Sequence, residues 1–255
     1  MQEISLVPEV IFKIGNFDVN NAVFATLFVT IIILVIAFLT SRKLSLIPSY
    51  FQITIEGMVS FFYTMLLDTY GNKKLAKSHT ALIVSLFLFV LISNQFSFIP
   101  LVQSITINGI IGFKPPTAHL SQTVALAIIV VGFSHYLGFK LSPLKHIGHY
   151  IKLESVLKIR KPGDIGMAFL DIFLGILELM GEVAKIISLS CRLFGNIFAG
   201  EVMIAVLVSL SIYTSYIVPV PFYVLGVFVG GIQALVFAYL ATSFISAMAI
   251  PHETH

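Results

Sequence analysis

Residues 178–201 read ELMGEVAKIISLSCRLFGNIFAGE, and this stretch decides how the rest of the chain is interpreted. It has the apolar character of a membrane helix, yet an Arg at the centre of a bilayer costs roughly 2.5–3.5 kcal/mol on insertion scales. Several ionisable groups in one such helix therefore need partners, water or an ion pathway. The ionisable residues of the stretch are Glu178, Glu182, Lys185, Arg192 and Glu201.

The composition places the chain among polytopic membrane proteins. Of its 255 residues, 58% are hydrophobic and only 11% are charged, against about 25% charged in soluble domains. A soluble chain of this length could not bury so much apolar surface. The single cysteine, Cys191, excludes an internal disulfide and a thiolate metal cluster. No signal-peptide pattern is visible, so we expect the first apolar helix to direct membrane insertion.

Five apolar segments predict an all-α polytopic membrane protein made of one domain, residues 1–255. About 20 apolar residues span the ~30 Å hydrocarbon core of a bilayer. The last two segments are longer, and a helix of ~40 residues reaches ~60 Å, so they are expected to form a strongly tilted hairpin. The predicted crossings are residues 19–41, 80–99, 121–139, 165–210 and 222–249.

Residues 49–70 follow a different pattern. Ser49 and Gln52 have the spacing of a capping box, which predicts a helix start. Apolar residues then recur at intervals of three and four, and polar residues form a stripe along another face of the helix. This pattern predicts an amphipathic helix that lies in the interface or packs against the bundle, with Gly71 as its stop.

Apart from Lys13 and Lys114, the Lys and Arg residues outside the apolar segments gather in two loops, at 42–79 and 140–164. Because cationic loops stay in the cytoplasm, both loops are predicted inside, with the N-terminus outside and the C-terminus inside. We expect the inner membrane of a bacterial cell, because no transit-peptide pattern is present. An organellar inner membrane or a thylakoid membrane is the alternative.

The spacing of the ionisable residues predicts how they face. Glu178, Lys185 and Arg192 are seven residues apart and share one stripe of a helix, with Ser188 and Asn196 beside Arg192. The last ionisable residue of the stretch, a glutamate nine positions beyond Arg192, turns to roughly the opposite face of the helix. Two polar faces on one helix indicate that water reaches it from more than one direction.

The final apolar segment has one strongly polar residue in mid-span, Gln233. Gly226, Gly230 and Gly231 surround it, and the first two have GxxxG spacing, which permits close approach of another helix. Taken alone, Gln233 would be an interhelical hydrogen-bonding residue.

Three motifs carry a resemblance to a known family. Residues 188–201 (SLSCRLFGNIFAGE), 233–237 (QALVF) and 94–100 (NQFSFIP) resemble the signature segments of subunit a of the F-type rotary ATP synthases. The order of these motifs and the predicted topology also fit, so the similarity covers nearly the whole chain.

The resemblance implies a stator that works against a rotating c-ring of small hairpins, each with one membrane carboxyl. Arg192 would be the fixed cation that favours release of the rotor's proton and separates two aqueous half-channels. Asn196, Glu201 and Gln233 would line the half-channels, and Glu178 and Ser188 stand at positions that the family keeps polar. The implied partners are the c-ring, b-type peripheral stalk subunits and the lipid bilayer, with no nucleic acid.

The resemblance also implies that the chain couples proton flow to ATP synthesis without a catalytic residue, metal or cofactor of its own. Two departures from the family pattern stand out. Some relatives carry a titratable residue where this chain has Gly226, and others carry Asp where Ser97 stands. At the predicted outer side, His119 and Asn94 are candidates for the mouth of a half-channel.

Structural roles are the alternatives for several of these residues. Arg192 could form an ion pair with Glu182 or Glu178, and Lys185 could pair with Glu178 or serve a channel. The chain could instead be a secondary transporter, but no internal repeat or broken helix is visible. A membrane-embedded hydrolase would need a Ser/His or acid dyad in the bilayer. The histidines lack metal-ligand spacing and are expected at the interface: His79, His119, His135, His146 and His149.

Overall fold

Six α-helices and two short strand pairs make up the part of the chain that the computed structural model describes. The described residues are 10–14, 17–42, 48–99, 106–107, 110–111, 114–141, 143, 162–210 and 217–249. The helices are α1 (Asn21–Arg42), α2 (Tyr50–Tyr70), α3 (Lys73–Ser97), α5 (Leu120–Leu141), α8 (Pro162–Leu210) and α9 (Pro219–Ala249). A 3₁₀ turn, η1 (Pro116–Ala118), precedes α5. His146, His149 and the C-terminal tail lie outside these ranges.

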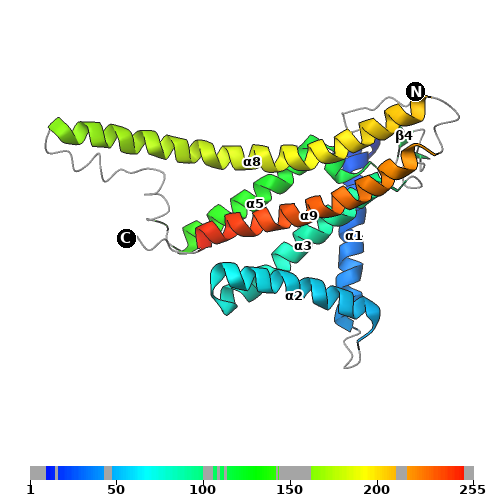
Figure 1. The fold of residues 1–255 in the computed structure, drawn as a ribbon, viewed down its shortest axis with the longest axis horizontal. Coiled ribbons are helices and arrows are strands. Elements are labelled where there is room, and N and C mark those ends of the chain that lie inside the picture. The colour runs from blue at the N-terminus through cyan, green and yellow to red at the C-terminus, as the bar shows by residue number, and fades with distance from the viewer. Residues whose placement is uncertain are drawn as a thin grey trace.

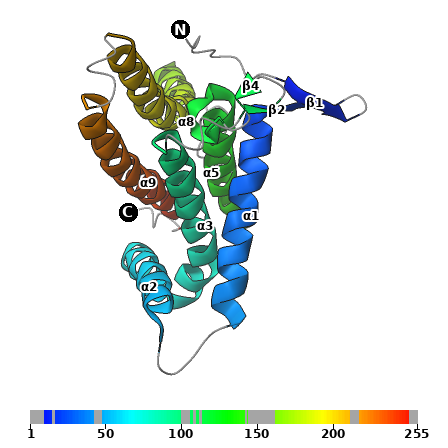
Figure 2. The same ribbon diagram turned by 90° about the vertical axis from the view of Figure 1, so that its right-hand side faces the viewer.

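The helices form one bundle, with α3 and α5 at its centre (Figures 1 and 2). Helix α9 packs against both α3 and α5, and α8 packs against α5 and α9. Helix α1 stands beside α3, and α2 lies across one end of it. This arrangement confirms the predicted all-α fold class with an amphipathic helix and a long hairpin.

Four of the helices are long and apolar enough to cross a membrane: α1, α3, α5 and α9. Among the described residues, α8 is not one of these four by the same measure of length, hydropathy and charge. It is the helix that contains the charged stretch 178–201. A fifth crossing by α8 therefore stays a prediction. Such a crossing helix would be unusual because it carries several charged residues.

Helix α8 runs for 49 residues without interruption, which corresponds to a length of about 74 Å. Its direction crosses that of α1 steeply, and its first half extends beyond the bundle (Figure 1). It is followed back along the bundle by α9, so the two make the predicted hairpin. A helix of this length cannot stand upright in a bilayer core of ~30 Å, in agreement with the steep tilt.

Helix α2 begins and ends where the sequence pattern predicts. The Ser49 side chain accepts a hydrogen bond from the backbone N–H of Gln52 at 3.4 Å. Gly71 adopts φ 62° and donates its N–H to the carbonyl of Leu67, which closes the last turn. Helix α3 starts directly afterwards at Lys73, with Asn72 as its N-cap, rather than at residue 80.

The end of α2 and the start of α3 are joined by a buried polar contact. The Tyr70 hydroxyl lies 3.0 Å from Nδ1 of His79, whose ring stands edge-on to Phe133 of α5. Burial raises the pKa of the Tyr70 phenol above its ordinary value, so the hydroxyl stays protonated. The His79 ring is buried between helices at 6% exposure, and its expected place at the membrane interface stays a prediction.

Apolar side chains fill the space between the helices. The largest buried cluster takes residues from α2, α3, α5, α8 and α9 and includes Phe62, Ile83, Val130, Leu193 and Phe237. Since α9 contributes Phe237 and α8 contributes Leu193, the hairpin is fixed to the bundle by its apolar faces. Of the ionisable side chains of α8, Arg192 is exposed, while Glu182 and Glu201 face neighbouring helices.

Two short antiparallel strand pairs accompany the helices, and the sequence patterns did not predict them. The first joins β1 (Val10–Ile14) to β2 (Phe17–Asn20), directly before α1. The second joins β3 (Thr106–Ile107) to β4 (Ile110–Ile111), between α3 and η1. Both lie at the same end of the bundle (Figure 2).

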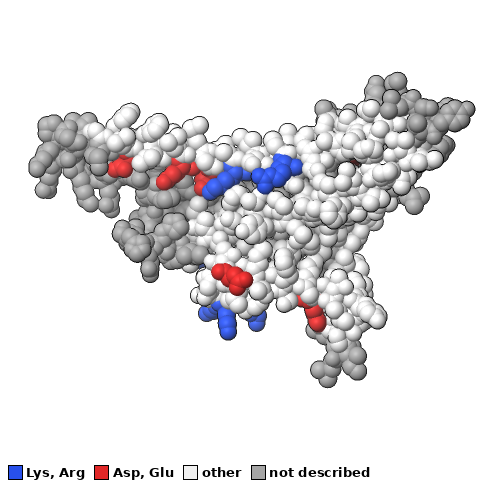
Figure 3. All heavy atoms as spheres, in the orientation of Figure 1, with Lys and Arg blue, Asp and Glu red and all other residues white. Residues whose placement is uncertain are grey.

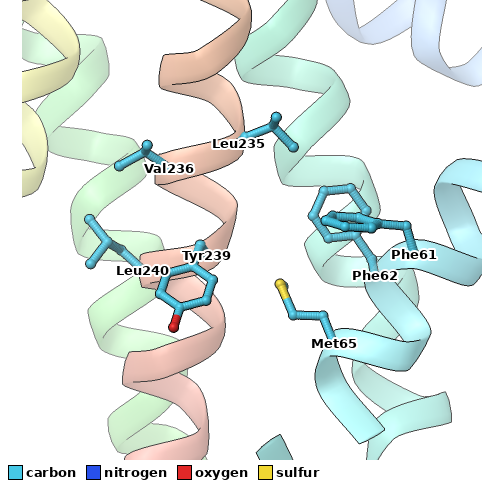
Figure 4. A pocket seen from close by; sticks show the side chains of 7 residues that line it. All are labelled: Phe61, Phe62, Met65, Leu235, Val236, Tyr239 and Leu240. Atoms are coloured by element: carbon cyan, nitrogen blue, oxygen red, sulfur yellow. The ribbon is translucent and has the colours of Figure 1, made fainter. Parts of the chain in front are cut away.

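A cavity of about 270 Å³ lies between α2 and α9 (Figure 4). Its lining is apolar apart from the Tyr239 hydroxyl and consists of Phe61, Phe62, Met65, Leu235, Val236, Tyr239 and Leu240. No Asp, Glu, His, Lys or Arg side chain lines the cavity, so it is not a candidate for a proton-transfer site.

Candidate functional site

The ionisable groups of the membrane body gather along α8. Figure 3 shows acidic and then basic side chains in a row over this helix, on a surface that is otherwise mostly uncharged. The basic residues of this row are Lys185, which is half-buried, and Arg192, which is exposed. The predicted polar stripe is therefore a surface feature of α8 and is accessible from one side of the bundle.

Arg192 is exposed and is the last ionisable residue of this stripe. Its Nη2 atom donates a hydrogen bond to the Ser188 hydroxyl at 3.3 Å, one turn earlier on the same face. Asn196, one turn later, is half-buried. Within the described ranges Arg192 forms no ion pair with a carboxylate, so neither Glu178 nor Glu182 neutralises it. Its positive charge is available to a group from outside the chain.

Glu201 lies on the side of α8 that faces the end of α3. The Ser97 side chain of α3 lies beside the Glu201 carboxyl group, and the charge of Lys114 also acts on it. Ser97 is 1% exposed, so this contact is enclosed between helices. The serine that departs from the family pattern thus contacts the glutamate directly.

Phe98 occupies the space between the ends of α3, α8 and α9. Its ring is 3.2 Å from the Cβ position that a side chain at Gly200 would have, and it overlaps the Cβ position of Gly226, at less than 3.0 Å. It also lies 3.6 Å from that of Gly230. The glycines of α9 therefore accept an aromatic ring, and a titratable side chain at Gly226 would require the ring to move.

Two side-chain amides connect α3 to the backbone of α9. Asn94 donates Nδ2 to the Gly230 carbonyl at 3.0 Å, and Gln95 donates Nε2 to the Val227 carbonyl at 3.1 Å. Asn94 is fully buried. The Asn94 side chain therefore joins α3 to α9. Its place at the mouth of a half-channel stays a prediction.

We expect Asn94→Ala to destabilise the protein by about 1 kcal/mol, because one hydrogen bond between helices is lost. The midpoint of thermal unfolding of the detergent-solubilised complex measures this change. Ser85→Ala is the matched control, since its hydroxyl is bonded only within its own helix and is exposed. An equal midpoint for the two variants would contradict the assignment of Asn94 as an interhelical link.

A second polar cluster lies at the seam between α5 and α8. Lys185 Nζ is 2.7 Å from Glu182 Oε1, and His135 Nε2 of α5 is 3.4 Å from Glu182 Oε2. Lys185 also lies over the ring of Phe244 of α9, 5.4 Å from its centroid. Lys185 thus pairs with Glu182 and not with Glu178, and His135 joins α5 to α8. The expected place of His135 at the membrane interface stays a prediction.

Among the described residues, no hydrogen bond or ion pair joins the remaining predicted site residues to Arg192. Gln233 is half-buried on α9 and forms no hydrogen bond with Arg192 among the described residues. Glu178 is half-buried on α8. His119 is 1% exposed, and its carbonyl accepts hydrogen bonds from Gln122 and Thr123 at the start of α5. Within the described ranges no group of three His, Cys, Asp or Glu side chains is placed to hold a metal.

The site as a whole has one exposed cation between two clusters that each contain a carboxylate. At about 1.5 Å per residue, Glu182 lies about 15 Å before Arg192 along α8 and Glu201 lies about 14 Å after it. The cluster at Glu182 involves α5, and the cluster at Glu201 involves α3. Sequence reasoning found Arg192 and Glu201 but missed Ser97 and His135, because their partners lie on other helices.

Four apolar helices and one long helix with ionisable groups define a multi-pass membrane protein. The family described as ATP synthase A chain matches residues 23–246. The chain therefore belongs to the ATP synthase A chain family. It is a proton-translocating component of an ATP synthase, which is an enzyme complex.

Proteins named ATP synthase subunit a are similar over nearly the whole chain. That of Moorella thermoacetica is 33% identical over 246 residues, which cover 96% of this chain and 98% of the relative. That of Syntrophobacter fumaroxidans is 30% identical over 249 residues, with coverages of 96% and 90%. That of Geobacter sulfurreducens is 32% identical over 225 residues, with coverages of 88% and 86%.

Proposed function

We propose that the chain is the stator against which the c-ring of an ATP synthase turns, with Arg192 as a fixed cation between two aqueous half-channels. The observation that carries this proposal is the exposed Arg192, which has no carboxylate partner among the described residues and lies between two carboxylate clusters. A guanidinium stays protonated at any physiological pH, so the charge is permanent.

The physical chemistry of a membrane carboxyl explains the need for such a charge. A rotor carboxyl must be neutral where it faces lipid, because burying a carboxylate without a partner is very costly. Opposite Arg192 the ionised form is stabilised, so the proton leaves there. Since the two half-channels do not meet, a proton crosses only by travelling with the rotor. The membrane potential supplies about 2.3 kcal/mol per charge per 100 mV to this movement.

We assign one half-channel to each carboxylate cluster. The outer one passes His119 and Asn94 and reaches Glu201, beside Ser97 and Lys114. The inner one opens toward the cationic loop at 140–164, which the positive-inside rule places in the cytoplasm. The N-terminus then lies outside the cell membrane of a bacterium, and the C-terminus lies in the cytoplasm.

The remaining predicted site residues complete this proposal. Ser188 orients the Arg192 guanidinium through its hydrogen bond, and Asn196, Gln233 and Glu178 add polar surface along the two paths. The chain itself forms no covalent intermediate and holds no cofactor. The b-type subunits of the peripheral stalk hold it against rotation, and the transported ion is the proton.

The role of Glu201 tests the outer half of this path. We expect Glu201→Gln to reduce ATP-driven proton pumping at least about tenfold in membrane vesicles that contain the complete ATP synthase, since an amide cannot carry a proton. Glu201→Asp should retain part of the activity. Glu56→Gln on α2 is the control, because it removes a carboxylate that is bonded only to Gln52 of its own helix. Undiminished pumping by Glu201→Gln would remove Glu201 from the path.

A further inference from the structure

The cluster of His135, Glu182 and Lys185 contains three ionisable groups in contact across two helices. Glu182 stands between the other two, with one carboxylate oxygen 2.7 Å from Lys185 Nζ and the other 3.4 Å from His135 Nε2. The exposed fractions are 12% for the Glu182 side chain, 26% for His135 and 32% for Lys185. The Glu182 carboxylate is therefore mostly buried, while the side chains of His135 and Lys185 on either side of it are partly exposed.

The position of Glu182 on α8 connects the helix seam to the Arg192 face. Glu182 is ten residues before Arg192, which turns it by about 80° away from Arg192, and the contact with His135 shows that this turn is toward α5. Lys185 is turned by only about 20° from Arg192, so it shares the exposed face. Contacts between ionisable side chains thus lead from Lys185 on the stripe of α8, through Glu182, to His135 on α5.

The far side of this seam is the inner side of the bundle. His135 lies five residues before Lys140, at the end of α5 that leads into the cationic loop 140–164. His119 stands at the opposite end of the same helix. The cluster and the Ser97–Glu201 contact therefore belong to opposite ends of α5.

A purely structural role explains the cluster poorly. Apolar side chains already join α5 to α8 and α9, and they include Ala127, Val130, Leu189 and Leu193. A buried ion pair adds little stability over apolar residues of similar volume, because both charges lose their hydration. Three ionisable groups at this seam are better explained by the transfer of protons, for which a carboxylate and an imidazole are suited.

We propose that Glu182 and His135 form the proton-exchange site of the inner half-channel, with Lys185 as the residue that positions the Glu182 carboxylate. This inference rests on the proposed function, because it assigns residues to a path that the stator role requires. It adds residues of this chain that neither the motifs nor the family resemblance assigned.

The transfer proceeds by successive proton movements through water. A rotor carboxyl that has come round to the α8 face loses its proton to a water molecule, and the hydronium formed gives the proton to the Glu182 carboxylate. The O–H bond of Glu182 then breaks as an N–H bond forms on Nε2 of His135. The imidazolium releases a proton to water on the inner side, so each group returns to its starting state. Lys185 keeps its charge throughout, and the sequence runs backwards when protons enter from the inside.

The test compares Glu182→Gln with Glu182→Asp in membrane vesicles that contain the assembled ATP synthase. Glutamine keeps the size of the side chain and an oxygen for Lys185 but cannot carry a proton, so ATP-driven proton pumping should fall at least about tenfold. Aspartate should retain most of the pumping. His135→Ala should also pump slowly, and added imidazole should restore its rate several-fold, which a structural contact would not allow.

The controls separate this inference from the proposed function. Glu56→Gln on α2 should pump as the unaltered protein does, and the amount of assembled complex should be equal in all variants. Normal pumping by Glu182→Gln, together with lost pumping by Arg192→Ala, would overturn the assignment of Glu182 and leave the stator role intact. Normal pumping by Arg192→Ala would instead overturn the proposed function. If His135→Ala pumps slowly but imidazole gives no rescue, His135 is a structural contact and its assignment fails.

Discussion

Replacement of Arg192 by alanine is expected to abolish coupled proton pumping, with a loss of at least about 100-fold in the rate driven by ATP. In the proposed function the guanidinium stabilises the ionised rotor carboxyl, so without it the proton is no longer expected to leave at that point. The barrier that a fixed positive charge presents to protons is removed as well. We therefore also expect a higher passive proton permeability in vesicles from which the soluble catalytic sector has been stripped.

The neighbouring variants show whether the charge or the contact matters. Ser188→Ala removes the hydrogen bond to Arg192 at 3.3 Å but keeps the charge, so a moderate loss of pumping is expected. Arg192→Lys keeps a cation without the planar fork of the guanidinium and should retain little activity. If Arg192→Ala assembled normally and pumped at the original rate, Arg192 would be a surface residue and the central assignment would be wrong.

Replacement of Gly226 by valine is expected to prevent most of the chain from assembling. A Cβ atom at this position overlaps the ring of Phe98, which is itself 5% exposed and packed against the backbone of Gly200 and Gly230. Overpacking of a filled core typically costs about 1–3 kcal/mol, and the two further methyl groups of valine place this variant at or above the upper value. The amount of chain in the assembled membrane complex and the midpoint of its thermal unfolding measure the effect.

Gly132→Val on α5 is the matched control, because a Cβ atom there meets no other atom within 4 Å. It should assemble nearly as well as the unaltered chain. Removal of the ring by Phe98→Ala in the Gly226→Val variant should restore part of the assembly, since the ring atoms that overlap the valine are then absent. Equal assembly of Gly226→Val and Gly132→Val would show that Phe98 does not occupy this space in the protein.

Local patterns in the sequence predicted most of the helical architecture. The capping serine Ser49 and the stop at Gly71 are contained in short segments, and the structure has both features. The long uninterrupted run that became α8 contains no internal proline, which left no reason for a break. Hydropathy also placed α5 and α9 within a few residues of their observed ends.

Contacts between distant segments could not be predicted in the same way. For Lys185, a pair with Glu178 on its own stripe and a channel role were the two alternatives, but it pairs with Glu182, one turn away, which also meets His135 of α5. Ser97 and Glu201 come together because α3 ends beside α8, which no local pattern records. The strand pairs before α1 and after α3 are short, and they lack the alternation that would identify them.

The steep inclination of α8 relative to α1 has a consequence for the timing of events. On a helix parallel to α1, Glu178 and Glu201 would differ in depth by about 35 Å, more than the thickness of the hydrocarbon core. Because α8 is steeply inclined to α1, most of this separation lies across the direction of α1 (Figure 1). In the proposed function, a rotor carboxyl that circles at constant depth would then meet these ionisable side chains one after another. The order of residues along the helix would become the order of steps in each passage of the rotor.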